Sequence, residues 1–205
     1  MKQDFFSIAR FPQCIAAVDC THIKIKNPGG EFGSRHRCRK NFYSINVQVV
    51  CDAHGKILDI VAKWRGSAHD SRIWRESAIA NHLQNVDLRG GVVLGDGGYA
   101  CSKILMTPFR ISAELSPAEQ RYNKAHIRTR ITVEQLFGQL KNKFRACFNG
   151  ININYDTAKA TIVAIAILHN ISKDGSNGDF IFFLVTWGLH WTFPMTGLSA
   201  SHQKI

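Results

Sequence analysis

Three acidic residues occupy positions where a carboxylate could do chemistry. Asp19 interrupts the apolar run CIAAVDCTHIKI, where an ionised carboxylate is costly to bury unless a cation or a metal ion pairs with it. Asp96 ends a short apolar run, and Glu134 lies on an amphipathic segment. Clustered carboxylates repel one another unless a cation holds them, and their hard oxygen atoms select Mg²⁺ or Mn²⁺. If the three converge, they predict metal-dependent hydrolysis or strand transfer at phosphorus.

Each acid also has a structural interpretation. Asp96 precedes Gly97 and Gly98, and aspartate before glycine is a common turn former. Glu134 could pair with Arg130 at four-residue spacing, a contact that contributes only ~0.2 to 0.5 kcal/mol. Asp19 has no cation nearby along its own strand, so only a distant Arg could give it a structural salt bridge. The functional interpretation is therefore favoured most at Asp19.

The surrounding pattern predicts one α/β domain with a mixed sheet that is opened by three antiparallel strands and flanked by helices. β-branched and apolar residues, interrupted by glycine-containing turns, predict strands over 14–25, 43–51 and 57–64, and a buried fourth strand that ends at Asp96. Apolar residues at helical spacing predict helices over 70–83, 124–148 and 156–172. Because sites in such folds lie at strand ends, the fourth strand points to Asp96.

The charge balance favours a polyanionic partner. Twenty-six Lys and Arg residues against 15 Asp and Glu give a net charge of +11, and the pI is about 9.6. Many basic proteins do not bind nucleic acid, so the charge alone is a modest argument. Arg130, Lys141 and Arg145 recur near the side of the long helix that carries Glu134, and they are the predicted contacts to DNA phosphates.

Other partners and compartments fit the sequence less well. The six cysteines form no CxxC pair, which disfavours both a disulfide framework and a zinc site and favours a reducing compartment. The first ten residues do not resemble a signal peptide. The apolar run over 180–191 is shorter than the ~20 residues of a membrane span, so no membrane association is expected.

Five sequence blocks, in order, resemble the nuclease domain of the PIF/Harbinger transposases and of the nucleases derived from them. They are FPQCIAAVDCTHIKI, FYSINVQVVCDAHGKILDI, WRGSAHDSRIW, VVLGDGGYACSKILMTPFR and NKAHIRTRITVEQLFGQLKNKF. This chain departs from the family pattern at Cys20, where the family usually has Gly, and at Ala100, where it usually has Pro. Neither departure removes an acidic residue.

The resemblance implies an RNase H-like fold and a DDE-type endonuclease domain over 1–174. Its acidic triad maps by motif onto Asp19, Asp96 and Glu134 as catalytic and metal-binding residues, and a further metal-associated aspartate maps onto Asp70. The implied cofactor is Mg²⁺ or Mn²⁺, and the implied partners are DNA and a Myb-like DNA-binding protein. The implied location is the nucleus, with the cytoplasm as an additional one. Residues 175–205 do not resemble the family, and we interpret them as an apolar tail without an assigned role.

Two functions of different classes are compatible with these observations. The intact acids favour an active endonuclease. The helical DNA-binding portion expected upstream in full-length relatives is not in this sequence, and the tail is unlike the family. Both points favour a catalytically inactive, domesticated or truncated DNA-associated protein. For either function, we expect the carboxylates of Asp19, Asp96 and Glu134 to lie close together, with Asp70 at the edge.

Overall fold

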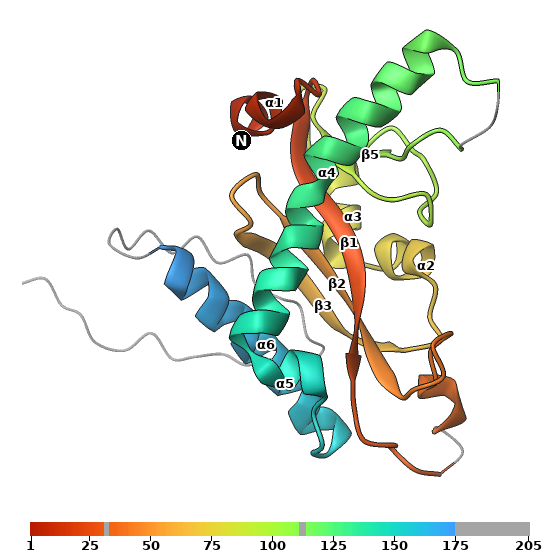
Figure 1. Ribbon diagram of the computed structural model, residues 1–205, viewed down its shortest axis with the longest axis vertical. Helices are drawn as coiled ribbons and strands as arrows, with labels where there is room; N and C mark the ends of the chain where they lie inside the picture. The colour runs from red at the N-terminus through yellow and green to blue at the C-terminus, as the bar shows by residue number, and fades with distance from the viewer. Residues whose placement is uncertain (31–32, 111–113, 175–205) are drawn as a thin grey trace, which may run out of the picture.

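The structure is a computed structural model that describes residues 1–30, 33–110 and 114–174 (Figure 1). The apolar tail predicted for 175–205, including the run over 180–191, lies outside the described residues. The elements are α1 (Lys2–Ala9), β1 (Cys14–Lys24), η1 (Ser34–His36), β2 (Ser44–Cys51), β3 (Ile57–Arg65), α2 (Asp70–Arg75), α3 (Ala78–Asn85), β4 (Val92–Leu94), β5 (Leu105–Met106), α4 (Pro117–Lys143), α5 (Arg145–Asn149) and α6 (Tyr155–Lys173).

The strands form one mixed sheet in the order β3-β2-β1-β4-β5. β1, β2 and β3 pair antiparallel, as the sequence predicts, and β4 then lies parallel to β1. The predicted connecting stretch after Asp96 contains a further short strand, β5, which pairs parallel to β4. The parallel pairing puts the end of β4 beside the middle of β1, where Leu94 lies opposite Ala17. Asp19 therefore lies on the strand next to the one that leads to Asp96.

Helices cover both faces of the sheet and enclose two apolar cores. The larger core lies between the sheet and α4 and α6, and it includes Val49, Leu136 and Ile162. The smaller core lies on the other face, where Val18 and Val50 pack with Trp74 of α2. Because β2 has neighbours on both edges and helices on both faces, all eight of its residues are buried. This mixed α/β arrangement is consistent with the predicted RNase H-like fold.

The long helix α4 starts earlier and ends earlier than its predicted range of 124–148. Ser116 accepts a hydrogen bond from the Glu119 backbone N–H, and the Glu119 carboxylate accepts one from the Ser116 N–H, which forms a capping box ahead of Pro117. The helix ends at Lys143, and a separate short helix, α5, begins at Arg145. Arg145 is therefore not on the helix that carries Glu134.

The single helix predicted over 70–83 is two helices. Ser77 separates α2 from α3: its Oγ donates to the Trp74 carbonyl at 2.7 Å and accepts from the Ala80 N–H at 3.2 Å. A serine that bonds to the backbone on both sides ends one helix and starts the next. Asp70 is the first residue of α2, and His69 is its N-cap.

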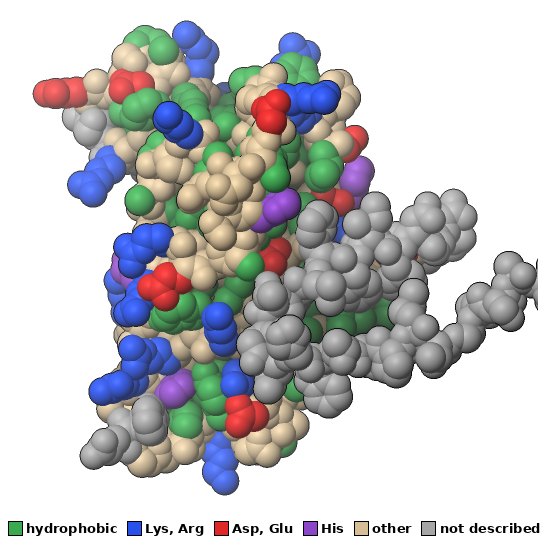
Figure 2. All heavy atoms as spheres, turned by 180° about the vertical axis from the view of Figure 1, so that it is seen from behind, with side chains coloured by type: hydrophobic (Ala, Val, Ile, Leu, Met, Phe, Trp, Pro, Cys, Tyr) green, Lys and Arg blue, Asp and Glu red, His purple; other side chains and the backbone are tan. Residues whose placement is uncertain are grey.

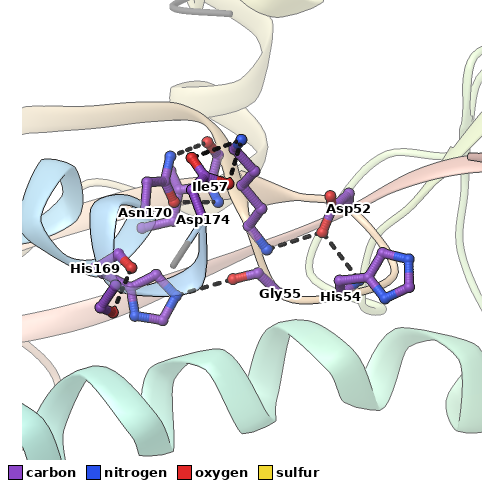
Figure 3. A network of polar contacts seen from close by, with 9 residues as sticks. Asp52, His54, Gly55, Ile57, His169, Asn170 and Asp174 are labelled. Carbon is purple, nitrogen blue, oxygen red and sulfur yellow. Dashed lines mark hydrogen bonds and ion pairs between the residues drawn. The ribbon is translucent and has the colours of Figure 1, made fainter. Parts of the chain in front are cut away.

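The C-terminal end of α6 is tied to the β2–β3 hairpin by polar contacts (Figure 3). The Asn170 amide donates to the Ile57 carbonyl at 2.8 Å and accepts from the Ile57 N–H at 2.9 Å. His169 Nε2 lies 2.9 Å from the Gly55 carbonyl oxygen, and Lys56 pairs with Asp174 at 2.8 Å. These contacts hold α6 against the first residues of β3 and close the larger core at that end.

Asp59 on β3 is a half-buried acid that none of the proposed chemistry uses. Its Oδ2 has no hydrogen-bond partner among the described residues, and burial raises the pKa of the carboxyl to about 6. The folded state therefore binds the proton of Asp59 more tightly than the unfolded state does. The stability that this preference contributes is fully present below about pH 4, the unfolded value, and is lost as the pH rises through about 6.

The Asp59→Asn variant is expected to be more stable than the wild type by ~1 kcal/mol at pH 7, because it removes the charge of a half-buried carboxylate whose buried Oδ2 has no partner among the described residues. The difference should disappear below about pH 3, where Asp59 is protonated in both the folded and the unfolded state. Urea unfolding at the two pH values measures it. Asp87→Asn, at an exposed carboxylate, should change the free energy of unfolding little at either pH. A destabilised Asp59→Asn at pH 7 would show that the carboxylate has a partner.

Candidate active site

Asp19 lies in the middle of β1 on the face covered by α4. It pairs across the sheet with Val49, which belongs to the larger core, and its side chain is only 16% exposed. Its Oδ1 accepts a hydrogen bond from the Cys20 N–H at 2.8 Å, and its Oδ2 accepts one from Arg130 Nη1 at 2.9 Å. The cation that the sequence lacks along this strand therefore comes from α4.

The same guanidinium also binds Glu134. Arg130 Nη2 donates to Glu134 Oε1, one helical turn further along α4. The local pair considered from the sequence is therefore present, but it is part of a three-membered bridge in which Arg130 joins Glu134 to Asp19. Arg130 is 13% exposed and Glu134 is 52% exposed, so the bridge runs from the buried strand out to the surface of the helix.

The Asp19 carboxyl titrates unusually for an aspartate. Burial raises its pKa to about 6, although Arg130 and the Cys20 N–H act in the opposite direction. The charge of Asp96, which follows the neighbouring strand β4, also raises the pKa slightly. A buried carboxylate with this preference is a typical component of a functional site, although structural ion pairs also perturb acids.

Asp96 sits in the turn that follows β4. Its Oδ1 accepts a hydrogen bond from the Gly98 N–H at 2.9 Å, and the Tyr99 N–H donates to the Asp96 carbonyl at 3.2 Å. The turn-forming role considered for Asp96 is thus present. It does not exclude a second role, because Oδ2 takes no part in that turn bond and the residue follows the strand beside Asp19.

Asp70 lies on the other face of the sheet. Its Oδ1 accepts a hydrogen bond from Asn46 Nδ2 at 2.9 Å. Asn46 pairs with His22, and because side chains alternate along a strand, this pair lies on the face opposite to Asp19 and Thr21. Ser71 Oγ donates to the Gly98 carbonyl, which links the start of α2 to the turn that holds Asp96. Ser71, not Asp70, makes this link, and among the described residues no hydrogen bond or ion pair joins Asp70 to Asp19 or Glu134.

Asn46 was missed by the sequence analysis. It is 1% exposed, and its amide also donates to the Ala68 carbonyl at 3.0 Å, while its Oδ1 has no partner among the described residues. The signal that singled out Asp19, a polar residue inside an apolar strand, is equally present at Asn46 in YSINVQVVC.

The acids do not form a ready three-ligand site. Across 1–30, 33–110 and 114–174, no three Asp, Glu, His or Cys side chains are grouped so that they could hold a metal ion. Carboxylate oxygens are nevertheless the ligands that a hard divalent cation prefers. Asp19 and Glu134 already share one cation, the Arg130 guanidinium, and the charge of Asp96 raises the pKa of Asp19. Convergence of all three acids on a metal ion stays a prediction.

The predicted DNA contacts differ in their surroundings. Lys141 Nζ donates to Thr21 Oγ1 at 2.7 Å, and burial lowers its pKa. Arg145 stacks over the Phe148 ring of α5, 5.0 Å from its centroid. Other Lys and Arg side chains are spread along the length of the face in Figure 2. Arg130 contacts Asp19 and Lys141 contacts Thr21, two residues further along β1, and charge alone does not locate a DNA path.

The chain is similar to one protein family and to several individual proteins. The family described as "DDE superfamily endonuclease" matches residues 18–170. Human HARBI1, designated a nuclease, is 32% identical over 201 residues, which cover 96% of this chain and 53% of that protein. Rat HARBI1 is 34% identical over the same shares, and an ALP1-like protein of Arabidopsis thaliana is 26% identical over 85% of this chain and 46% of its own length.

This chain therefore spans about half the length of these relatives. No solved structure matches it significantly. In the described part of the chain, no helix is long and apolar enough to cross a membrane.

Proposed function

The chain belongs to the DDE superfamily endonuclease family, and from that premise we propose that it cleaves DNA phosphodiester bonds in a divalent-metal-dependent reaction at Asp19, Asp96 and Glu134. The observation that carries the proposal is the position of Asp19. It is a largely buried carboxylate on the central strand, next to the strand that leads to Asp96 and bridged to the helix that carries Glu134. Two of the three acids come from the sheet, and the third comes from a helix packed on it.

Mg²⁺ or Mn²⁺ would be held by Asp19, Asp96 and Glu134, and when bound it activates a water or hydroxyl nucleophile and stabilises the leaving oxygen. Asp19 has a fixed position because it pairs with Val49 of β2 and its carboxylate is held by the Cys20 N–H and Arg130. Glu134 is half exposed and is the acid best placed to meet an incoming substrate. Lys141, anchored at Thr21 on the same face of β1, lies where it can attract a phosphate toward Asp19.

Asp70 keeps a proposed role in metal association, because it begins α2, whose next residue, Ser71, binds the turn that holds Asp96. We further propose nuclear DNA as the substrate and a separate Myb-like protein as a source of targeting. Both follow from the resemblance alone.

The proposed activity is tested by incubating the full chain with supercoiled plasmid and Mg²⁺, Mn²⁺, Ca²⁺ or EDTA. Nicking is expected with Mg²⁺ or Mn²⁺ and is expected to be lost with EDTA and in Glu134→Gln. Glu76→Gln is the matched control, because Glu76 also pairs with an Arg four residues away, but on α2. Nicking that persists in EDTA or in Glu134→Gln would contradict the proposed chemistry.

One observation favours the alternative function, a DNA-associated protein that does not cut. Arg130 already neutralises two of the three acids, and a chain in which that bridge never opens would not bind metal. DNA binding without nicking in any metal would favour this alternative.

A further inference from the structure

Arg130 lies between two acids that belong to different layers of the fold. Asp19 comes from β1 and Glu134 from the next turn of α4, and each binds a different amino group of one guanidinium. The side chains of Arg130 and Asp19 are both largely buried, at 13% and 16% exposed. A planar guanidinium with several fixed N–H groups is suited to this geometry, because it can donate to two carboxylates at once.

The guanidinium carries out the electrostatic task that a divalent metal would have at the same acids. Carboxylates brought together repel one another unless a positive charge lies between them. Both oxygens of Asp19 are engaged, one by the Cys20 N–H and the other by Arg130. A metal ion that binds Asp19 and Glu134 must therefore compete with Arg130 for the oxygens that Arg130 now holds.

We propose that Arg130 is a resident counter-ion of the acidic site, which holds Asp19 and Glu134 together without metal and is displaced from them when a divalent cation binds. The inference rests on the proposed function and adds a positioning residue to it. The displaced guanidinium remains on the helix beside the site, and Glu134 marks its open, half-exposed side. A DNA phosphate arriving there would be the natural new partner for the released guanidinium.

Displacement couples the two ligands of the site. A metal ion that frees Arg130 makes a phosphate-binding group available, and a phosphate that captures Arg130 frees the carboxylates for metal. Because linkage is reciprocal, DNA should tighten metal binding by the same factor by which metal tightens DNA binding. A guanidinium with a purely structural role would produce no such coupling.

The test is a Mn²⁺ titration of the full chain by calorimetry, without DNA. Arg130→Gln is expected to bind Mn²⁺ about tenfold more tightly than the wild type, because the competing cation is gone, a change of about 1.4 kcal/mol. Arg130→Lys should lie between them, since an ammonium keeps the charge but lacks the planar fork. Arg128→Gln, at an exposed arginine on the same helix, should bind Mn²⁺ like the wild type.

A second measurement adds DNA to the same titration. Wild-type Mn²⁺ affinity should rise when a short DNA duplex is added, and this increase should be lost in Arg130→Gln. Unchanged or weaker Mn²⁺ binding by a folded Arg130→Gln, or wild-type binding that ignores DNA, would overturn the inference while leaving the nuclease proposal in place. Failure of every variant to bind Mn²⁺ would overturn the nuclease proposal itself.

Discussion

The Asp19→Asn variant is expected to lose metal-dependent DNA cleavage by about 10³-fold or more. Asn keeps the shape of the side chain and an oxygen that can accept from the Cys20 N–H, but it removes the charge that a divalent cation needs. A bound metal ion contributes several kcal/mol of transition-state stabilisation, and each 1.36 kcal/mol corresponds to a tenfold change in rate. The measurement is single-turnover nicking of supercoiled DNA in Mn²⁺.

The matched control for this variant is Asp59→Asn. Burial also raises the pKa of Asp59 to about 6, but Asp59 pairs with Val50, which packs in the core on the side of α2 and α3. Its substitution should leave the cleavage rate unchanged. Equal loss of cleavage in both variants would trace the defect to folding, and wild-type cleavage by Asp19→Asn would remove Asp19 from the site.

Leu136→Ala is expected to lower the free energy of unfolding by ~2 to 5 kcal/mol. Leu136 is 1% exposed and lies on the buried side of α4, two residues after Glu134, in the larger core. Its truncation removes contacts and leaves a cavity beneath the helix that carries Glu134. Urea denaturation followed by circular dichroism measures the change.

Leu168→Ala is the matched control, because Leu168 is also helical but 51% exposed on α6. Its substitution should change the free energy of unfolding by less than ~0.5 kcal/mol. If the two variants are equally stable, α4 is not anchored to the sheet through Leu136.

Long, periodic segments were predictable from the sequence. The three antiparallel strands, the strand that leads to Asp96 and the last helix lie within one or two residues of their predicted ranges, because each has a strong apolar pattern bounded by turn residues. The similarity to Harbinger transposase-derived nucleases, inferred from five blocks, is confirmed by the family match and by the HARBI1 and ALP1-like relatives.

Short elements could not be predicted in the same way. β5 has only two residues, and it is a strand because Val93 and Leu94 on β4 offer it a parallel partner. The break at Ser77 depends on two hydrogen bonds of one hydroxyl, which the apolar spacing over 70–83 does not reveal. The first helix, α1, has a modest apolar pattern, and Phe5 is its one buried residue.

In the site, a contact within one helix could be predicted from the sequence, but a contact between distant residues could not. The Arg130 to Glu134 pair follows from spacing on one helix, whereas the Arg130 to Asp19 contact joins residues 111 positions apart. Only the packing of α4 on β1 reveals that one guanidinium serves both acids. The position of Asp70 on the opposite face likewise depends on the register of β1 and β2.

The contacts between α6 and the hairpin bear on how the molecule avoids aggregation. β3 is an edge strand, and the free N–H and C=O groups of such a strand can template the addition of a strand from another molecule. At Ile57 the Asn170 amide occupies both of these groups, as a neighbouring peptide would. A short piece of the sheet edge is thus closed by a side chain, and self-association through that end of β3 is obstructed without a further strand.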